Sequence, residues 1–572
     1  MVCLPCLFSL VAATGSADPP RPPTNAVSDI FTPVAFDQQH LGGLFANRLR
    51  ANTEGYLEGI NEEELLQSAQ RGTDKSSSGS RMGLFLQAAA DAYEYTNDAH
   101  LKTIMDRVAR GLIQQTQDSG VATQAGSPAQ TGGQVLRYGN ALAGLLAYSY
   151  TTGNDEAFGA ARRIADLVVK TSGPGERDNK TTPDIASAVA LMRPMIEMYR
   201  HTGDSRYLSS CKYLATLRPQ QLSLQDSLVQ ASGFAELYRL TGDESYKNFA
   251  TSTWRNVHKE YLSIAGAPDS QKVSGSDQPD SSSGSSACQT VAWMQLTLGL
   301  LRITGEAQYA EQLEWTLYNQ LLAHQNSSTG KLYSCVALEG SKTPAANPDE
   351  CTSAAALGIA EIPEGVWGRF EDGLAVLSYS SGRARVRLRR RATVELISEG
   401  NYPETGNILL HIEPSHDIRF PLRLRVPAWT RSFLAQVGDN RLTGSPGEYL
   451  TIDREWKRGD TVRIEIDMTT HLRMDAGHPG EIAIERGPQL LALGKRANPG
   501  IQDFRNAVVN AESVTALPLP VGDPKMPFDA MSDQAYRVAG EYNGNSQQLV
   551  FLPFAEAITY RVWIKGTNTG GR

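Results

Sequence analysis

The sequence predicts an α+β protein of several domains, in which a helical toroid is followed by an antiparallel β-sandwich. One observation behind this is a series of amphipathic helical segments separated by a recurring Thr-Gly-Asp turn. The other is a change, near residue 370, to short strands in which apolar and polar residues alternate. We expect the toroid over residues 28–365, the sandwich over 366–490, and a β-rich region over 491–572 that completes or extends the sandwich.

Five turns punctuate the helical region. Three have nearly the same sequence, at residues 201–204, 240–243 and 303–306, and variants lie at 95–98 and 151–155. A glycine just past a helix end adopts the left-handed conformation that satisfies the last carbonyls, and the Asp after it can cap the next helix. Each unit is therefore a helical hairpin, and hairpins must pack side by side to bury their apolar faces. An open solenoid would also bury them, but the irregular spacing of the turns favours a closed toroid.

The segments that follow are short and rich in β-branched residues, with Gly, Pro, Asn and Asp between them. From Arg383 to Arg391, Arg alternates with apolar residues, which indicates one solvated strand face. The sequence YRVWI at 560–564 indicates a closing strand. The other candidate strands lie at residues 374–381, 384–397, 407–414, 420–429, 461–468 and 481–486.

Charge and hydropathy exclude several classes of protein. A net charge of -8 and a pI near 5.7 argue against a nucleic-acid-binding or anionic-membrane surface. No segment has the about 20 consecutive apolar residues that a membrane span needs. Residues 1–17 contain an apolar run and end in a small-x-small pattern, so we expect a signal peptide and a secreted or periplasmic protein. No feature of the sequence indicates an oligomeric state.

The cysteines are too few for a disulfide scaffold. Of six, Cys3 and Cys6 would leave with the signal peptide, and four thiols remain in a long chain. Cys211 falls in a helical segment and Cys335 in a strand-like one. We expect both of these side chains in the core.

Several motifs resemble a known family. They include ACQTVAWMQL at 287–296 with the helical run that follows it, ECTSAAALGIAEIPE at 350–364, LRLRVPAWT at 422–430, REWKRGD at 454–460 and IERGPQLLALG at 484–494. In order and spacing these resemble the β-L-arabinofuranosidase family, glycoside hydrolase family 127, from about residue 45 to about residue 494. The resemblance implies an (α/α)6 barrel followed by a β-sandwich, and a carbohydrate as the partner.

The resemblance also implies a zinc-bound cysteine thiolate as nucleophile and a glutamate as acid/base. In the family, zinc is held by a Glu-x-Cys pair and by two consecutive cysteines. Here the first pair corresponds to Ser286-Ala287-Cys288, and the second to Glu350-Cys351, so that Glu350 stands at the nucleophile. A register shifted by one would make Cys351 the nucleophile and Thr352 the missing ligand. The first register is preferred because it keeps the following Thr-Ser and Ile-Pro in place.

Other positions of the family pattern are altered as well. Gln271 is the nearest match to the acid/base glutamate, and a Gln side chain cannot protonate a leaving group. A Gly-Glu-His-like stretch corresponds to Gly79-Ser80-Arg81, and a His-Lys-Tyr-like stretch to Tyr138-Gly139-Asn140. The resemblance thus implies Glu350 and Gln271 as the catalytic positions, with Arg81 and Tyr138 in substrate binding.

Two questions about these residues stay open. Cys288 and Cys351, with Glu350, could hold zinc, or the two cysteines could be buried thiols or one disulfide. Glu350 could act as a carboxylate nucleophile or base, which requires a second carboxyl about 5 Å away for retention or roughly 6.5–9.5 Å away for inversion. Three acids in the preceding loop could supply it, or could be solvated loop residues: Asp269, Asp277 and Asp280. Three aromatic residues could stack on a sugar, although their helical spacing favours the core: Trp293, Trp315 and Tyr318.

The sequence therefore supports one function with two alternatives. The first is a glycoside hydrolase with altered catalytic residues that acts on sugars of plant or algal polysaccharides. The second is a non-catalytic carbohydrate-binding protein on the same scaffold. A polysaccharide lyase or epimerase is a third possibility, because helical toroids host these reactions too.

Overall fold

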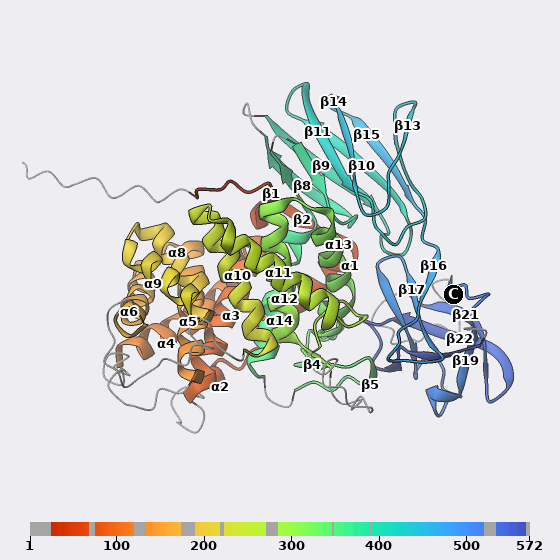
Figure 1. The fold of residues 1–572 in the computed structure, drawn as a ribbon, viewed down its shortest axis with the longest axis horizontal. Coiled ribbons are helices and arrows are strands. Elements are labelled where there is room, and N and C mark those ends of the chain that lie inside the picture. The colour runs from red at the N-terminus through yellow and green to blue at the C-terminus, as the bar shows by residue number, and fades with distance from the viewer. Residues whose placement is uncertain are drawn as a thin grey trace, which may run out of the picture.

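The structure is a computed structural model. It describes residues 25–67, 75–118, 132–172, 189–217, 222–269, 284–345, 348–371, 373–388, 392–519 and 534–567. In this part of the chain a ring of helices lies beside two β-rich regions (Figure 1). The predicted signal peptide, together with Gln271, Asp277 and Asp280, lies outside the described residues.

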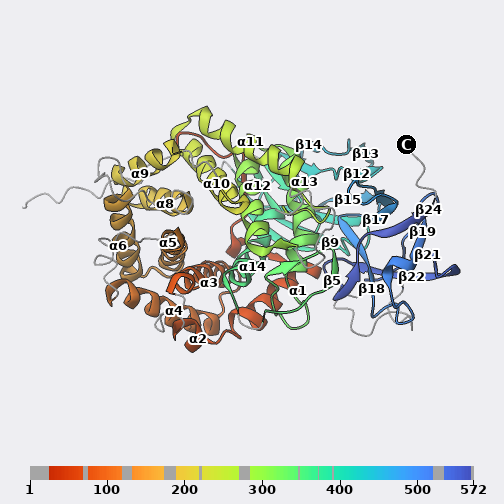
Figure 2. The same ribbon diagram turned by 60° about the horizontal axis from the view of Figure 1, so that its bottom comes forward.

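Six of the described helices form a closed inner ring, which Figure 2 shows from one end. Neighbours in this ring are α3, α5, α8, α10, α12 and α14, and α14 packs back on α3. Helix α12 is buried on almost every side, as expected for a helix enclosed by others. The bounds are α3 Lys75–Thr96, α5 Gly132–Thr152, α8 Met192–Thr202, α10 Leu224–Thr241, α12 Ala287–Thr304 and α14 Glu350–Ala360.

A second layer of helices packs on the outside of the ring. Each outer helix is joined to an inner one by a short turn or packs directly against it. The outer helices are α1 Gly43–Asn52, α4 Ala99–Asp118, α6 Asp155–Ser172, α9 Ser205–Thr216, α11 Glu244–Glu260 and α13 Ala307–Thr316. Shorter elements are η1 Phe36–Gln38, η2 Thr53–Leu57, α2 Glu62–Gln67, η3 Val189–Leu191, η4 Leu317–Leu321 and η5 Ile362–Gly365. The predicted toroid is confirmed.

The turns between the two layers are those that the sequence predicts. Gly203 and Gly242 have φ values of 68° and 72°, and the amide of each donates to the carbonyl four residues earlier at 2.8 Å. Asp204 and Asp243 then cap the next helices by accepting hydrogen bonds from backbone amides at 3.0 and 2.9 Å. A side chain larger than glycine would strain the left-handed residue of each turn.

Two sheets form the predicted sandwich. In the first the strand order is β1-β6-β7-β11-β14, and in the second it is β13-β12-β15-β10-β9-β8-β2. The bounds in the first sheet are β1 Phe31–Pro33, β6 Trp367–Phe370, β7 Gly373–Val376, β11 Ile418–Arg425 and β14 Tyr449–Trp456. Those in the second are β2 Gln39–Leu41, β8 Gly382–Arg387, β9 Thr393–Gly400, β10 Asn407–Pro414, β12 Phe433–Val437, β13 Asn440–Thr443 and β15 Asp460–Ile466.

The sandwich therefore begins before the toroid, because β1 and β2 precede the first helix. The register of β1 on β6 pairs Phe31 with Phe370, across more than half of the chain. In β8, Arg383 and Arg385 are exposed while Ala384 between them is buried, which confirms the predicted solvated face.

A third sheet follows at Thr470, so the predicted limit of the sandwich at residue 490 falls inside it. It includes β5, a strand that comes from within the helical region. Its strands are β5 Glu339–Ser341, β16 Thr470–Arg473, β17 Glu481–Arg486, β18 Gln489–Gly494, β19 Ala507–Asn510, β20 Leu517–Pro518, β21 Tyr536–Tyr542, β22 Asn545–Pro553, β23 Thr559–Arg561 and β24 Ile564–Thr567. The 3-10 turn η7 Phe504–Asn506 precedes β19.

The burial of individual side chains in the structure tests several predictions about the core. Trp293 and Tyr318 are buried in the toroid, and Trp315 is half-buried with its indole donating to the Ile264 carbonyl at 2.8 Å. Cys211 is buried as predicted. The prediction for Cys335 is wrong: its thiol is exposed, because it lies in the two-residue strand β4 (Cys335–Val336) at an end of the toroid. No helix among the described residues is both long enough and apolar enough to cross a membrane.

Candidate active site

The inner helices run in the same direction, so their first turns meet at one end of the toroid. Glu350 is the first residue of α14 and lies at this end, which we call the Glu350 end. Asp349 caps α14: its Oδ1 accepts a hydrogen bond from the Thr352 amide at 2.8 Å, and its own amide donates to Thr352 Oγ1 at 2.9 Å. The partial positive charge of a helix N-terminus favours an ionised carboxylate at this position.

Two neutral side chains from neighbouring inner helices hold Glu350. The Ser80 hydroxyl of α3 donates to Glu350 Oε1 at 2.7 Å. The Asn140 amide of α5 donates to Ser80 Oγ at 2.6 Å and to Glu350 Oε1 at 3.3 Å. Ser80 is buried, whereas Asn140 and Glu350 are partly exposed. These two donors fix one oxygen of the Glu350 carboxylate.

Ser80 and Asn140 are contacts that the sequence-based assignment did not single out. It placed Arg81 and Tyr138 in the site, from the same two stretches of the family pattern. Helical geometry explains the difference, because adjacent residues point about 100° apart around a helix axis. The stretches were the right signal, but the pattern alone does not tell which residue of each faces Glu350. Tyr138 is half-buried on α5, two residues before Asn140.

A disulfide joins two inner helices beside Glu350. Cys288 of α12 and Cys351 of α14 are bonded, with their Cα atoms 4.8 Å apart. The sequence left a metal pair, free thiols or a disulfide as alternatives for these residues. The assignment of Cys288 and Cys351 as metal ligands is therefore corrected, because a disulfide sulfur carries no thiolate to bind a metal.

The residues present do not fit the zinc site that the family resemblance implies. The sulfurs of Cys288 and Cys351 are both used by the disulfide, and Ser286 and Glu350 stand at the other two ligand positions. The Ser286 hydroxyl caps α12 by accepting from the Gln289 amide at 3.2 Å. Among the residues that the structure describes, no three His, Cys, Asp or Glu side chains are grouped so that they could hold a metal ion.

Two further carboxylates, those of Asp349 and Asp269, lie near Cys335 at the Glu350 end. Partial desolvation raises the pKa of the Cys335 thiol, and the negative charges of Asp349 and Asp269 raise it further. The strand β3 (Ser285–Ser286) pairs with β4 and sets Ser286 opposite Cys335. The Asp349 carboxylate is occupied, because its Oδ2 accepts from the Ser334 hydroxyl at 2.6 Å while Oδ1 caps α14.

Arg81 is buried at the same end. Only 8% of its surface is exposed, and its side chain forms no hydrogen bond or ion pair with any residue in the described part of the chain. Burial raises the pKa of the Tyr56 phenol, an effect that the charge of Arg81 opposes. The Tyr56 hydroxyl lies 3.0 Å from the hydroxyl of Ser353, one turn of α14 after Glu350. Arg81 therefore approaches the first turn of α14.

Comparison with family models gives two matches. The model described as the catalytic domain of GH127 β-L-arabinofuranosidases matches residues 43–355, and the model described as the middle domain of the same enzymes matches residues 373–468. The chain is also similar to a non-reducing end β-L-arabinofuranosidase of Bifidobacterium longum subsp. longum. The identity is 24% over 529 residues, which cover 76% of this chain and 78% of the relative.

Solved structures share the fold. A GH127 β-arabinofuranosidase matches with a TM-score of 0.81 and 19% identity, over 94% of this chain and 98% of the other. A GH127 β-L-arabinofuranosidase from Geobacillus stearothermophilus T6 matches with a TM-score of 0.78 and 17% identity, over 92% and 100% of the two chains. These structures confirm the arrangement of a helical domain followed by strand-rich domains.

Proposed function

Because the chain belongs to glycoside hydrolase family 127, we propose that it hydrolyses L-arabinofuranosyl or closely related side chains of plant or algal polysaccharides, with a carboxylate in place of the family's cysteine nucleophile. The names of the matched domains and of the Bifidobacterium relative support the sugar class. The name of that relative also favours attack at the non-reducing end of the substrate.

The observation that carries the proposal is the placement of Glu350. Its carboxylate stands at the first residue of α14, and one of its oxygens is fixed by Ser80 at 2.7 Å and Asn140 at 3.3 Å. The partial positive charge of the α14 N-terminus favours the ionised form of this carboxylate. A fixed and ionised carboxylate is the group that glycoside hydrolysis uses as nucleophile or base.

The reaction needs a second carboxyl to protonate the leaving oxygen. Both oxygens of Asp349 are occupied, because Oδ1 caps α14 and Oδ2 accepts from Ser334, which leaves Asp269 as the proposed donor among the described acids near Cys335. A Glu350 oxygen would bond to the anomeric carbon while the glycosidic C–O bond breaks, and the leaving oxygen would take the Asp269 proton. Water would then cleave the glycosyl ester, returning one proton to Asp269 and releasing Glu350.

A second function is favoured by the disulfide. The bond between Cys288 and Cys351 removes the family's zinc chemistry while it leaves the scaffold intact. The same end of the toroid would then bind a sugar without cleaving it. This carbohydrate-binding role predicts affinity for arabinofuranosyl ligands and no turnover.

A screen on aryl glycosides of L-arabinofuranose and related sugars separates the two functions. Glu350→Gln should lower the rate by roughly 100- to 10,000-fold, as expected for loss of a reacting carboxylate. Glu244→Gln is the matched control, because Glu244 is also the first residue of a helix but belongs to α11 in the outer layer. Equal rates for wild type and Glu350→Gln would contradict the assignment. Binding without turnover would favour the carbohydrate-binding role.

We also propose that the protein acts outside the cytoplasm, where polysaccharides occur. The apolar run in residues 1–17 supports export. The Cys288–Cys351 disulfide supports it independently, because disulfides persist in oxidising compartments. Fractionation of expressing cells, with a mass measurement on the exported chain, tests this proposal.

A further inference from the structure

Arg81 is an exception among the buried arginines of the described chain. The other four, Arg48, Arg239, Arg425 and Arg486, all have partners. Arg48 forms an ion pair with Glu556 at 2.5 Å, Arg425 pairs with Glu314 at 2.5 Å, and Arg239 with Asp29 at 2.7 Å. Arg486 donates to the Glu404 carbonyl at 2.9 Å. Arg81 has none of these, although only 8% of its surface is exposed.

An unpartnered guanidinium in such a place is costly. A buried cation loses most of its hydration, and only a counter-charge or several acceptors can replace it. The Nε atom of Arg81 is fully enclosed and donates to no atom of the residues that the structure describes. The Arg81 side chain is therefore available to an acceptor that does not belong to the described chain.

The position of Arg81 ties this charge to the proposed active site. Its neighbour Ser80 donates directly to Glu350 at 2.7 Å. Its charge acts on the Tyr56 hydroxyl, which contacts Ser353 of α14 at 3.0 Å. Arg81 thus lies in the second turn of α3, next to a residue that holds the reacting carboxylate.

We propose that Arg81 binds an anionic substituent of the carbohydrate, either the carboxylate of a uronic acid or a sulfate ester. This inference rests on the proposed function, since it takes the Glu350 end as the place where sugar binds. A guanidinium presents paired donors that match both anions, and each such hydrogen bond is strengthened by charge. The substrate would then be an acidic polysaccharide that carries arabinofuranosyl groups, rather than a neutral arabinan.

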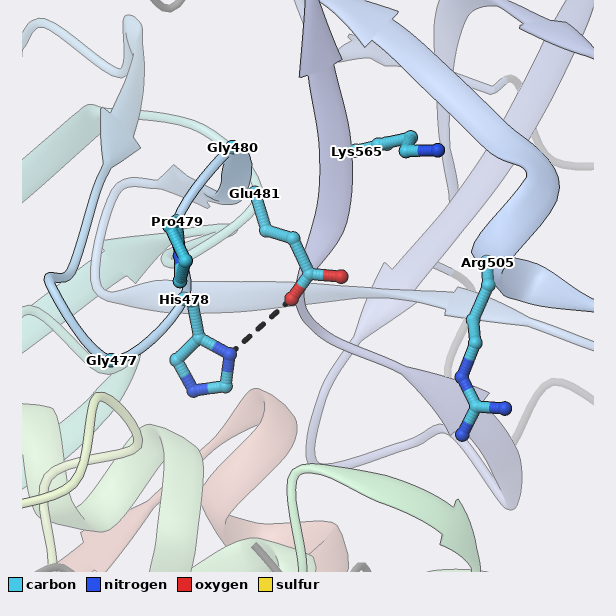
Figure 3. A pocket seen from close by; sticks show the side chains of 7 residues that line it. All are labelled: Gly477, His478, Pro479, Gly480, Glu481, Arg505 and Lys565. Atoms are coloured by element: carbon cyan, nitrogen blue, oxygen red, sulfur yellow. Dashed lines mark hydrogen bonds and ion pairs between the residues drawn. The ribbon is translucent and has the colours of Figure 1, made fainter. Parts of the chain in front are cut away.

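A second group of basic residues, outside the toroid, could also bind anions and must be distinguished from Arg81 in the experiment. A pocket of about 400 Å³ in the third sheet is lined by His478, Glu481, Arg505 and Lys565 (Figure 3). Glu481 accepts from Arg561 at 2.6 Å and lies 3.3 Å from the His478 ring, while Arg505 and Lys565 are exposed. Exposed charges are screened by solvent and contribute little to binding. This pocket therefore serves as a control for anion binding outside the toroid.

The test is a calorimetric titration in the Glu350→Gln background, in which ligand is not consumed. Three ligands of equal length are compared: a neutral arabinofuranosyl oligosaccharide, one with a single hexuronate, and one with a single sulfate ester. We expect an acidic ligand to bind about 10- to 100-fold more tightly than the neutral one. The preferred acid identifies the anion.

Variants locate the effect. Arg81→Met should abolish the preference for the acidic ligand, Arg81→Lys should keep part of it, and the double variant Arg505→Ala/Lys565→Ala should keep all of it. Circular dichroism checks that each variant is folded. If the neutral ligand binds and no acidic ligand binds better, or if the preference survives Arg81→Met, the inference is wrong and the proposed function stands. If no ligand binds, the proposed function fails as well.

Discussion

The two ends of the toroid use charged residues in opposite ways. At the end opposite Glu350, which we call the Asp29 end, Arg239 donates to both oxygens of Asp29 at 2.7 and 2.8 Å and to Glu236 at 2.7 Å. Arg200 also donates to Glu236 at 2.7 Å, and Arg302 lies 3.0 Å from Asp29. At the Glu350 end, Arg81 has no partner among the described residues, and the Ser80 and Asn140 side chains donate to Glu350.

The backbone explains which end is closed. The segment before β1 crosses the last turns of the inner helices, where the Val27 amide donates to the Arg239 carbonyl at 3.0 Å and the Ile30 amide to the Arg302 carbonyl at 2.8 Å. Basic residues at helix C-termini are favoured by the helix dipole, and here acids in turn neutralise them. Burial would raise the pKa of Glu236, but Arg239 and Arg200 outweigh it and hold that pKa at about 2. Ion pairs thus stabilise the Asp29 end, whereas Arg81 at the other end has no partner among the described residues.

The largest effect on stability is expected from breaking the Asp29 end. Arg239→Met leaves Asp29 and Glu236 buried with fewer counter-charges, so unfolding free energy should fall by about 3 kcal/mol. Urea unfolding followed by circular dichroism measures it. Arg419→Met is the control, because the Arg419–Asp453 pair is exposed and its loss should change little. Equal stability of the two variants would refute the structural role of the Asp29 end.

Removal of the disulfide should cause the next largest loss of unfolding free energy. Cys288 and Cys351 are 63 residues apart in sequence, so the bond restricts a long loop of the unfolded chain. Cys288→Ser should therefore cost about 2–4 kcal/mol of unfolding free energy. Cys335→Ser, at an exposed thiol, should leave stability unchanged. A Cys288→Ser protein as stable as wild type, or wild type with both thiols reactive under native conditions, would speak against the bond.

Near the Asp29 end, the toroid also contains a buried carboxyl group, that of Glu361, which holds its proton in the folded state. Burial raises the pKa of Glu361 to about 8, with Glu364 adding to the shift, and Gln295 donates to its Oε1 at 2.7 Å. The folded state therefore holds a proton that the unfolded state, with a pKa of 4.5, releases. Stability should be full below pH 4.5 and fall by up to about 1.4 kcal/mol per pH unit as the pH rises toward 8.

Thermal unfolding at a series of pH values measures this loss. Glu361→Gln has no proton to release, so its stability should fall less between pH 5 and pH 8 than that of wild type. Burial also raises the pKa of Asp91 and Glu364, which leaves a smaller dependence in the variant. Parallel pH profiles of the variant and wild type would contradict the assignment of the proton to Glu361.

The smallest change in stability is expected at Arg81. Arg81→Met removes a desolvated charge that has no partner in the described chain, so unfolding free energy should rise or stay within about 1 kcal/mol of wild type. This is the direct counterpart of Arg239→Met, and both are measured by urea unfolding. A loss as large as that of Arg239→Met would mean that Arg81 has a structural partner, which would erase the contrast between the two ends.

Local rules account for the parts of the fold that the sequence predicted. Gly203 with Asp204, and Gly242 with Asp243, end one helix and begin the next through contacts within a few residues. The alternation of polar and apolar residues in β8 likewise predicts which of its side chains are exposed and which are buried. The position of β1 could not be predicted in this way, since it pairs with β6 through residues far away in sequence.

The sequence proposes positions for the site but does not give the contacts between them. The family pattern led to Glu350 and to the stretches that hold it, yet the sequence could not show that Ser80 and Asn140 face the carboxylate. It also left the state of Cys288 and Cys351 open, because pairing over 63 residues depends on the tertiary fold. That Arg81 has no partner among the described residues is a property of its surroundings in the fold, which a sequence motif does not contain.

The most direct test of the account is hydrolysis of an aryl β-L-arabinofuranoside before and after dialysis against a zinc chelator. We assign the reaction to the Glu350 carboxylate, and both candidate zinc thiols are joined in a disulfide. We therefore predict a rate that dialysis leaves unchanged in wild type and that Glu350→Gln lowers by roughly 100-fold or more. A rate that disappears on chelation and returns with added zinc would contradict this assignment.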